Sequence, residues 1–188
     1  MDSIDVTRIE RRARLKYEWS RARRAVLGFG PALIVVVIAA LASKHPNAAV
    51  AFGGAMFVVG VTLLWYGRDV RRGVLPGLAM GLIPLVLGLC ANHMGHACQG
   101  DHCMTLCVPA CTAGGLAAGI GVSLIGLRWK QGLAFWTGAT ALTLLTGAMG
   151  CSCAGYTGVA GLAIGYAVGL LPGLIRRGRA TWGKSNQA

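Results

Sequence analysis

Six long apolar runs restrict this chain to folds that cross a membrane. None contains Asp, Glu, Lys or Arg. Each has about 18–21 residues, which at about 1.5 Å of rise per residue spans a hydrocarbon core of about 30 Å. The sequence therefore predicts an all-α, polytopic membrane fold with six transmembrane helices arranged as three hairpins. The six runs are Ala25–Ser43, Ala48–Tyr66, Val74–Ala91, Val108–Leu127, Gly132–Gly150 and Gly155–Ile175.

The basic residues predict how these helices are oriented. All but one of the 18 Lys and Arg residues lie in the N-terminal segment, the second and fourth connectors or the C-terminal tail, and the exception is Lys44. Short loops rich in Lys and Arg stay in the cytoplasm, so both termini are expected there. The predicted parts are a basic cytoplasmic segment 1–24, a transmembrane domain 25–175 with an outer connector 92–107, and a basic tail 176–188. Because the net charge of +12 comes from these clusters, nucleic acid is not an expected partner.

All seven cysteines are predicted to lie on the outer side of the membrane, together with the histidines. Three alternative chemistries would use such an arrangement. The first is disulfide bonding, which an oxidising compartment favours. Bridges are expected to join the 98–111 segment to Cys151 or Cys153. Cys90, near the apolar end of the third run, is expected to stay unpaired, because the number of cysteines is odd. The cysteines assigned to disulfide or redox chemistry are Cys98, Cys103, Cys107, Cys111, Cys151 and Cys153.

Metal binding is the second chemistry, and redox switching through a labile disulfide is the third. Thiolates and imidazoles together suit Zn²⁺ and Cu⁺, so these are the expected ions if a metal is bound. If the fourth apolar run begins early as a helix, Cys103 and Cys107 lie one turn apart on one face. The candidate metal ligands are His93, His96, Cys98, His102, Cys103 and Cys107.

Glycines recur every fourth residue in the last apolar run. Such a stripe leaves a smooth helix face, against which another backbone packs closely in lipid. Packing within the chain is favoured over a dimer interface, because a six-helix chain offers many internal partners. The stripe consists of Gly161, Gly165, Gly169 and Gly173.

Aromatic residues near the ends of the runs are expected at the membrane interface, where they anchor helices. These residues are Trp65, Tyr66, Trp129, Trp136 and Trp182. The N-terminal segment 6–24 is expected to form a basic amphipathic helix, which either lies on the anionic inner leaflet or docks a cytosolic partner. Its candidate contact residues are Arg11, Arg12, Tyr17 and Trp19.

Catalysis is not expected from this sequence. The apolar runs lack the carboxylates and buried bases that ion-coupled transporters use, and the chain carries no P-loop, HExxH or nucleophile-elbow motif. We therefore expect neither an enzyme nor a pump.

The layout resembles the six-helix membrane anti-sigma factors of bacteria. The features that carry the resemblance are the short basic N-terminus, the six apolar runs, Cys107 or Cys111 at the start of the fourth run, and Cys151 or Cys153 before the sixth. It implies a bacterial inner-membrane regulator, with the outer Cys/His cluster as the input and a cytosolic sigma factor as the partner. Two alternatives stay open. One is a disulfide-stabilised accessory subunit bound to other membrane subunits; the other is a soft-metal carrier, for which only Met56, Met80 and Met149 lie within the bilayer.

Overall fold

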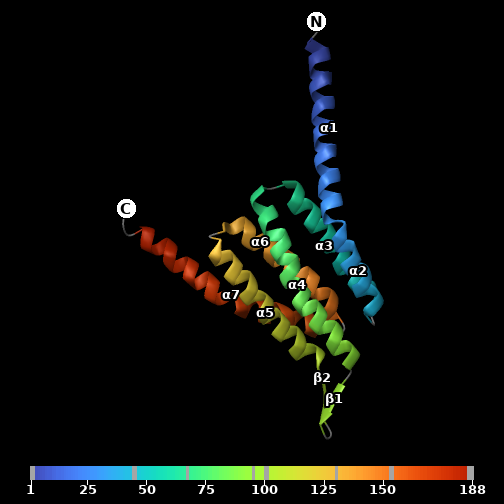
Figure 1. The fold of residues 1–188 in the computed structure, drawn as a ribbon, viewed down its shortest axis with the longest axis vertical. Helices are drawn as coiled ribbons and strands as arrows, with labels where there is room; N and C mark the ends of the chain where they lie inside the picture. The colour runs from blue at the N-terminus through green and yellow to red at the C-terminus, as the bar shows by residue number, and fades with distance from the viewer. Residues whose placement is uncertain are drawn as a thin grey trace.

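The structure is a computed structural model that describes residues 3–43, 46–66, 68–94, 96–99, 102–129, 131–152 and 155–185. Within these residues the chain forms seven helices and one two-stranded hairpin (Figure 1). In chain order the elements are α1 (Ser3–Phe29), α2 (Pro31–Ala42), α3 (Pro46–Tyr66), α4 (Arg68–Met94), β1 (His96–Gln99), β2 (His102–Thr105), α5 (Cys107–Arg128), α6 (Leu133–Cys151) and α7 (Tyr156–Ser185).

Five helices, α3 to α7, are long and apolar enough to cross a membrane. The spans within them follow the apolar runs of the sequence to within a few residues, although α4 begins earlier, at Arg68, and α7 continues to Ser185. Large apolar side chains such as Ile34, Leu75, Leu124 and Ile164 are exposed on the outside of the bundle. An aqueous surface rarely carries so continuous an apolar cover. The chain thus has the helices and the surface of a multi-pass membrane protein.

The first apolar run is broken rather than continuous. The helix α1 continues to Phe29, and α2 begins at Pro31 at an angle of 43° to it. Proline has no N–H to donate and its ring collides with the preceding helical turn, so the helix bends at this point. The amide of Gly30 accordingly bonds to the carbonyl of Leu27, one residue short of the α-helical partner. The sequence analysis treated Ala25–Ser43 as one straight span and missed this break. The bent pair passes the test for a sixth span only when its two helices are taken together.

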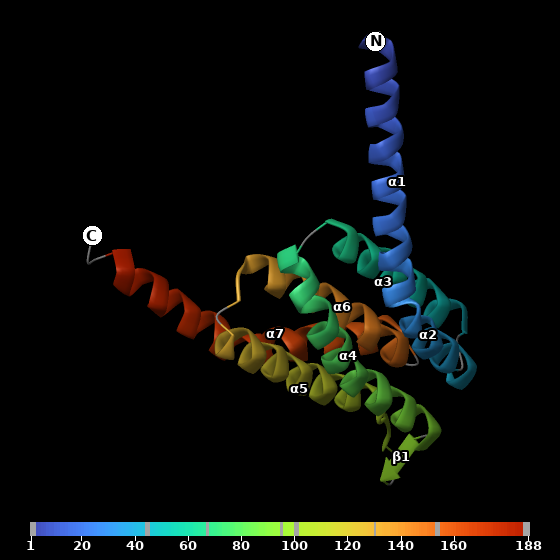
Figure 2. The ribbon, with the colours of Figure 1, turned by 45° about the horizontal axis from the view of Figure 1, so that its top comes forward.

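The core of the bundle consists of α4, α5, α6 and α7, with α2 and α3 on one side (Figure 1 and Figure 2). The helices α4 and α6 run in the same direction and touch along a glycine face. A Cβ added at Gly77 would lie 2.8 Å from the carbonyl oxygen of Ala139, and one at Gly88 would lie 2.8 Å from the backbone of Gly150. The hydroxyl of Thr143 also donates to the carbonyl of Gly77 at 3.0 Å. Small residues thus bring the two backbones together, as is usual between helices in lipid.

The helices α5 and α7 form the second close pair. The glycine stripe of α7 lies against α5 along its whole length: Gly161 meets Thr112, Gly169 meets Ile120 and Gly173 meets Ser123. The stripe therefore packs within the chain, where it sets the distance between two core helices.

Adding a side chain to the glycine stripe between α5 and α7 gives a direct prediction. A methyl group at Gly165 would press on the carbonyl oxygen of Thr112 and lie 3.1 Å from the amide nitrogen of Leu116. We expect Gly165→Ala to lower the free energy of unfolding by about 1–3 kcal/mol, the usual cost of overpacking a core. The matched control is Gly54→Ala in α3, where an added Cβ meets nothing within 4 Å. Thermal unfolding in detergent measures both variants. A Gly165→Ala protein as stable as the control would contradict the close packing of α7 on α5.

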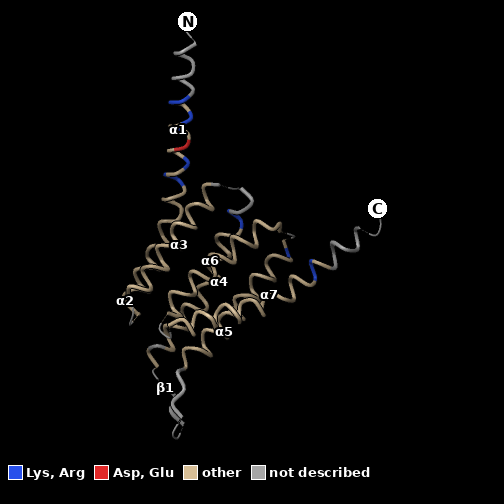
Figure 3. The backbone as a smooth tube through the Cα atoms, turned by 180° about the vertical axis from the view of Figure 1, so that it is seen from behind, with Lys and Arg blue, Asp and Glu red and all other residues tan. Residues whose placement is uncertain are grey.

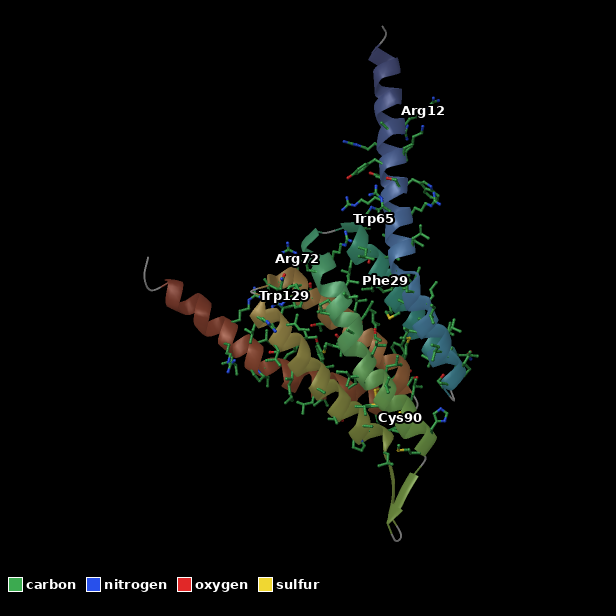
Figure 4. The ribbon with its side chains drawn as sticks, in the orientation of Figure 1. Arg12, Phe29, Trp65, Arg72, Cys90 and Trp129 are labelled. Atoms are coloured by element: carbon green, nitrogen blue, oxygen red, sulfur yellow. A yellow bond between two sulfur atoms is a disulfide. The ribbon has the colours of Figure 1, made fainter. Side chains whose placement is uncertain are left out.

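One aromatic residue does not lie where the sequence analysis placed it. Trp65 and Trp129 are exposed near the ends of α3 and α5, at the same end of the bundle as Arg72 (Figure 4), which is typical of an interface. Trp136 is instead only 6% exposed. Its ring fills the space that Gly126 of α5 and Gly173 of α7 leave open. The expectation of an interfacial Trp136 was wrong, because the glycines that admit the ring lie on two other helices. The side chain of Trp182 lies outside the described residues.

The described basic residues gather at one end of the bundle. Figure 3 shows them on α1 and at the ends of α4, α5 and α7 that lie away from the β1–β2 hairpin. The hairpin extends beyond the opposite ends of α4 and α5 (Figure 1). The molecule is therefore polarised along its long axis, with basic side chains at one end and the cysteine-rich segments at the other.

Candidate functional site

The end of the bundle away from α1 holds a buried cysteine pair. Cys111, in the second turn of α5, and Cys151, the last residue of α6, lie at disulfide distance with their Cα atoms 5.8 Å apart. Both are 0% exposed and pack with Ala148 and Leu162. The pair joins the two segments that the sequence analysis connected. A bridge that closes a loop of this length, with a sequence separation of 40, contributes about 4 kcal/mol by restricting the unfolded chain.

Glycines about one helical turn from each cysteine allow α5 and α6 to come this close to α4. Pro84 of α4 lies between Gly114 of α5 and Gly147 of α6: added Cβ atoms there would lie 2.7 Å and 2.8 Å from its atoms. Three helices thus converge on the proline ring just below the cysteine pair. After Cys151 the chain turns back into α7 through Gly155, whose φ of 65° is a conformation that favours glycine. The ends of α4, α5, α6 and α7 near the cysteine pair are therefore held together at one point.

The connector between α4 and α5 forms an antiparallel hairpin, which the sequence analysis did not predict. The register places Cys98 directly opposite Cys103, His96 opposite Thr105, and Gln99 opposite His102. Because Cys103 lies in β2 and the helix begins at Cys107, the helix does not start early enough for these two cysteines to share a helical turn. The chain is extended before Cys107 because β2 pairs with β1, and this pairing delays the start of α5.

The register also divides the predicted metal ligands. Alternate residues of a strand belong to opposite faces, so His96, Cys98 and Cys103 share one face of the hairpin and His102 belongs to the other. His93, in the last turn of α4, is exposed. Among the described side chains, no group of three or more His, Cys, Asp or Glu residues gathers into a metal site. The side chains of His96, Cys98, His102 and Cys103 lie outside that description.

Three further cysteines were considered in the sequence. Cys90 is exposed near the end of α4 and is a free thiol, as expected (Figure 4). Cys107 is half-buried at the first position of α5, one helical turn before Cys111. Cys153 lies outside the described residues.

Threonine hydroxyl groups on α6 bond to neighbouring helices, and the sequence analysis did not identify them. The buried Thr146 donates to the sulfur of Met56 on α3 at 3.2 Å, and the hydroxyl of Tyr166 on α7 donates to the half-buried Thr140 at 3.1 Å. With Thr143, these threonines recur every third residue of an apolar run. That spacing was the available signal, since polar side chains at helical spacing in lipid face other helices. The sulfur of Met56 is thus engaged in the core.

The opposite end carries a long basic helix. Arg11, Arg12, Tyr17 and Trp19 on α1 are all exposed, and α1 extends well beyond the bundle (Figure 1 and Figure 4). The exposed apolar residues Leu15, Trp19 and Val26 follow one another at spacings of four and seven residues. Tyr17 and Leu27 are also exposed but lie on other faces, among the basic residues, so α1 does not have the amphipathic character that the sequence analysis expected. The helix therefore offers both charge and apolar surface for contact.

Comparison of the chain with models of known protein families, with characterised proteins and with solved structures finds no significant match.

Proposed function

We propose that this chain is a bacterial inner-membrane regulator, which reads the thiol or metal state of its outer cysteine-rich end and acts on a cytosolic protein through α1. The observation that carries the proposal is the polarity of the molecule. The cysteine pair and the hairpin lie at one end, and an exposed basic helix extends from the other. A cytosolic sigma factor is the partner that the resemblance to membrane anti-sigma factors suggests.

The proposed topology has six spans, with the bent α1–α2 pair as the first and both termini in the cytoplasm. Its support is the concentration of Lys and Arg at one end of the bundle. The cysteines then face the oxidising side, where disulfides persist. The same face would meet Zn²⁺ or Cu⁺ before any cytoplasmic buffer does.

Reporter fusions in cells test the topology. Green fluorescent protein fused after residue 188 should fluoresce, because it folds in the cytoplasm, and alkaline phosphatase inserted after residue 100 should be active, because it needs an oxidising compartment. Exchanging the two reporters is the control and should abolish both signals. An active phosphatase at the C-terminus would contradict the six-span arrangement.

A route between the two ends is present in the packing. The outer ends of α4 to α7 meet around Pro84 and the cysteine pair, while α3 contacts α6 through Met56 and Thr146. Phe29 at the end of α1 fills the space beside Gly60 of α3. A change in the relative position of the outer helix ends can therefore reach the base of α1 through close contacts, if these have two arrangements.

Partner recovery tests the function. The intact protein should bring down a cytosolic protein that a variant lacking residues 3–20 does not, and Cys98→Ser/Cys103→Ser or Cys111→Ser/Cys151→Ser should change the amount recovered. Cys90→Ser is the matched control, because Cys90 is an exposed free thiol of the same end. Equal recovery with all variants, the deletion included, would contradict the regulator proposal.

The alternative proposal is an accessory subunit whose disulfide only stabilises the bundle. The complete burial of Cys111 and Cys151 favours it, since a buried bridge resists exchange. Under this alternative, Cys111→Ser/Cys151→Ser lowers the amount of folded protein but leaves the recovery of membrane partners per folded molecule unchanged.

A further inference from the structure

We propose that Cys98 and Cys103 form a cross-strand disulfide in the β1–β2 hairpin and that this pair, not Cys111–Cys151, exchanges with small thiols of the outer compartment. The inference deepens the proposed function and rests on its outward placement of this end. It assigns four of the seven cysteines, two to a buried pair and two to an exchangeable pair.

The register of the hairpin is the first support. Cys98 and Cys103 are direct partners across the two antiparallel strands. The Cα atoms of such partners lie about 4.5 Å or about 5.5 Å apart, depending on whether the pair is hydrogen-bonded. Disulfides span about 4.4–6.8 Å between Cα atoms, so either kind of pair meets the requirement without backbone movement.

Access to the two pairs is the second support. The hairpin extends beyond the ends of α4 and α5, and its strands make no extensive contact with any described helix (Figure 1). Attack on a disulfide requires a thiolate to reach one sulfur along the S–S axis. Cys111 and Cys151 are both 0% exposed, so α5 and α6 would have to separate first. The hairpin lies outside the helix bundle, so a solute thiol can approach it without separating any helices.

The length of the closed loop is the third support. Only four residues separate Cys98 from Cys103, whereas the sequence separation of Cys111 and Cys151 is 40. A short loop loses little entropy on closure, so its disulfide is stabilised less against reduction. Exposed disulfides with little stabilisation are the labile ones.

The exchange proceeds in two balanced steps. The thiolate of a small thiol such as glutathione attacks one sulfur of the pair, forms a mixed disulfide and releases the other cysteine as a thiolate, which takes up a proton. A second small thiol then attacks the mixed disulfide and releases the oxidised dimer. Overall, one protein disulfide becomes two thiols and two small thiols become one disulfide.

The consequence for the bundle follows from connectivity. β1 follows directly after α4 and β2 directly precedes α5, so a bridge between the strands restricts how far the outer ends of these helices can separate. Reduction removes that restriction while the buried pair still holds α5 to α6. The hairpin pair can therefore alter the α4–α5 contact without unfolding the protein.

Differential alkylation of the purified full-length protein tests the inference. Thiols are blocked with iodoacetamide at graded concentrations of reduced glutathione, and mass spectrometry reports the labelled cysteines. Without reductant, Cys98 and Cys103 should be unlabelled. Both should become labelled together at a glutathione concentration about tenfold lower than Cys111 and Cys151 require. Labelling of Cys98 and Cys103 without reductant, or metal bound stoichiometrically to their free thiols, would overturn the proposal.

Two variants test whether Cys98 is the disulfide partner of Cys103. In Cys98→Ser, Cys103 should become labelled without reductant while Cys111 and Cys151 stay protected; a Cys103 that stays protected has another partner, and the pairing is then wrong. Cys90→Ser should leave the pattern of both pairs unchanged. This experiment is independent of the regulator proposal, because a confirmed exchangeable pair with unchanged partner recovery would overturn the function and leave the pair standing.

Discussion

Replacing Cys111 and Cys151 by Ser should lower the free energy of unfolding of this protein by about 4 kcal/mol, measured as denaturant unfolding in detergent. The bridge closes a loop with a sequence separation of 40 and joins α5 to α6 at the point where α4 and α7 also meet. Without it, the unfolded chain gains freedom that the folded chain cannot. Serine is close in size to cysteine, so the variant leaves no large cavity and the loss reports the bridge itself.

Reduction of the wild-type protein provides an independent measurement of the same quantity. Under strong reductant the wild type should be no more stable than Cys111→Ser/Cys151→Ser measured under the same reductant, because the bridge that the variant lacks is then absent from both proteins. The control Cys90→Ser should unfold like the wild type, because Cys90 is an exposed free thiol. A double variant as stable as the oxidised wild type would show that no bridge forms between these residues.

Trp136→Ala should cost on the order of 3 kcal/mol of stability, whereas Trp129→Ala should cost much less. Trp136 is 6% exposed and its ring fills the gap beside Gly126 and Gly173, so truncation leaves a cavity between α5, α6 and α7. The value is the lower end for truncating a large aromatic residue in a core, because lipid tails solvate an apolar ring better than water does. Trp129 is 66% exposed and leaves no cavity.

The two tryptophans form a matched pair only seven positions apart, so their comparison isolates packing from chemistry. Thermal unfolding in the same detergent measures both variants. Equal destabilisation would mean that Trp136 is an interfacial anchor and that the glycine-lined space between α5 and α7 is not filled by its ring.

Much of the fold was accessible from the sequence because lipid imposes a simple rule. A helix must be apolar over its whole length, and the ends of the uncharged runs therefore coincide closely with those of α3, α5 and α6. The spacing of Gly161, Gly165, Gly169 and Gly173 likewise indicated a contact face. These signals do not reveal which helices pack against each other. The position of Trp136 depends on glycines from two other helices, and that of Pro84 depends on Gly114 and Gly147.

The candidate site was accessible only in part for the same reason. Clustering of cysteines indicated that one end of the bundle carries the site, and the expected link from the 98–111 segment to Cys151 or Cys153 corresponds to the Cys111–Cys151 pair. The hairpin was missed because strands are recognised in a sequence by alternating apolar and polar residues. These two four-residue strands, rich in Cys, His and Gln, do not show that alternation. The break at Pro31 was missed because hydropathy alone does not show whether a helix bends within an apolar run.

The central claim is that the outer thiol state is read at the cytoplasmic end, and photo-cross-linking from position 17 tests it most directly. A photoreactive phenylalanine replaces Tyr17, which is exposed on α1. Spheroplasts are irradiated before and after a membrane-impermeant reductant is added outside. The account predicts an adduct with a cytosolic protein whose yield changes on reduction, and a Cys98→Ser/Cys103→Ser background in which the yield no longer responds. An adduct pattern that is the same in both states would contradict the account.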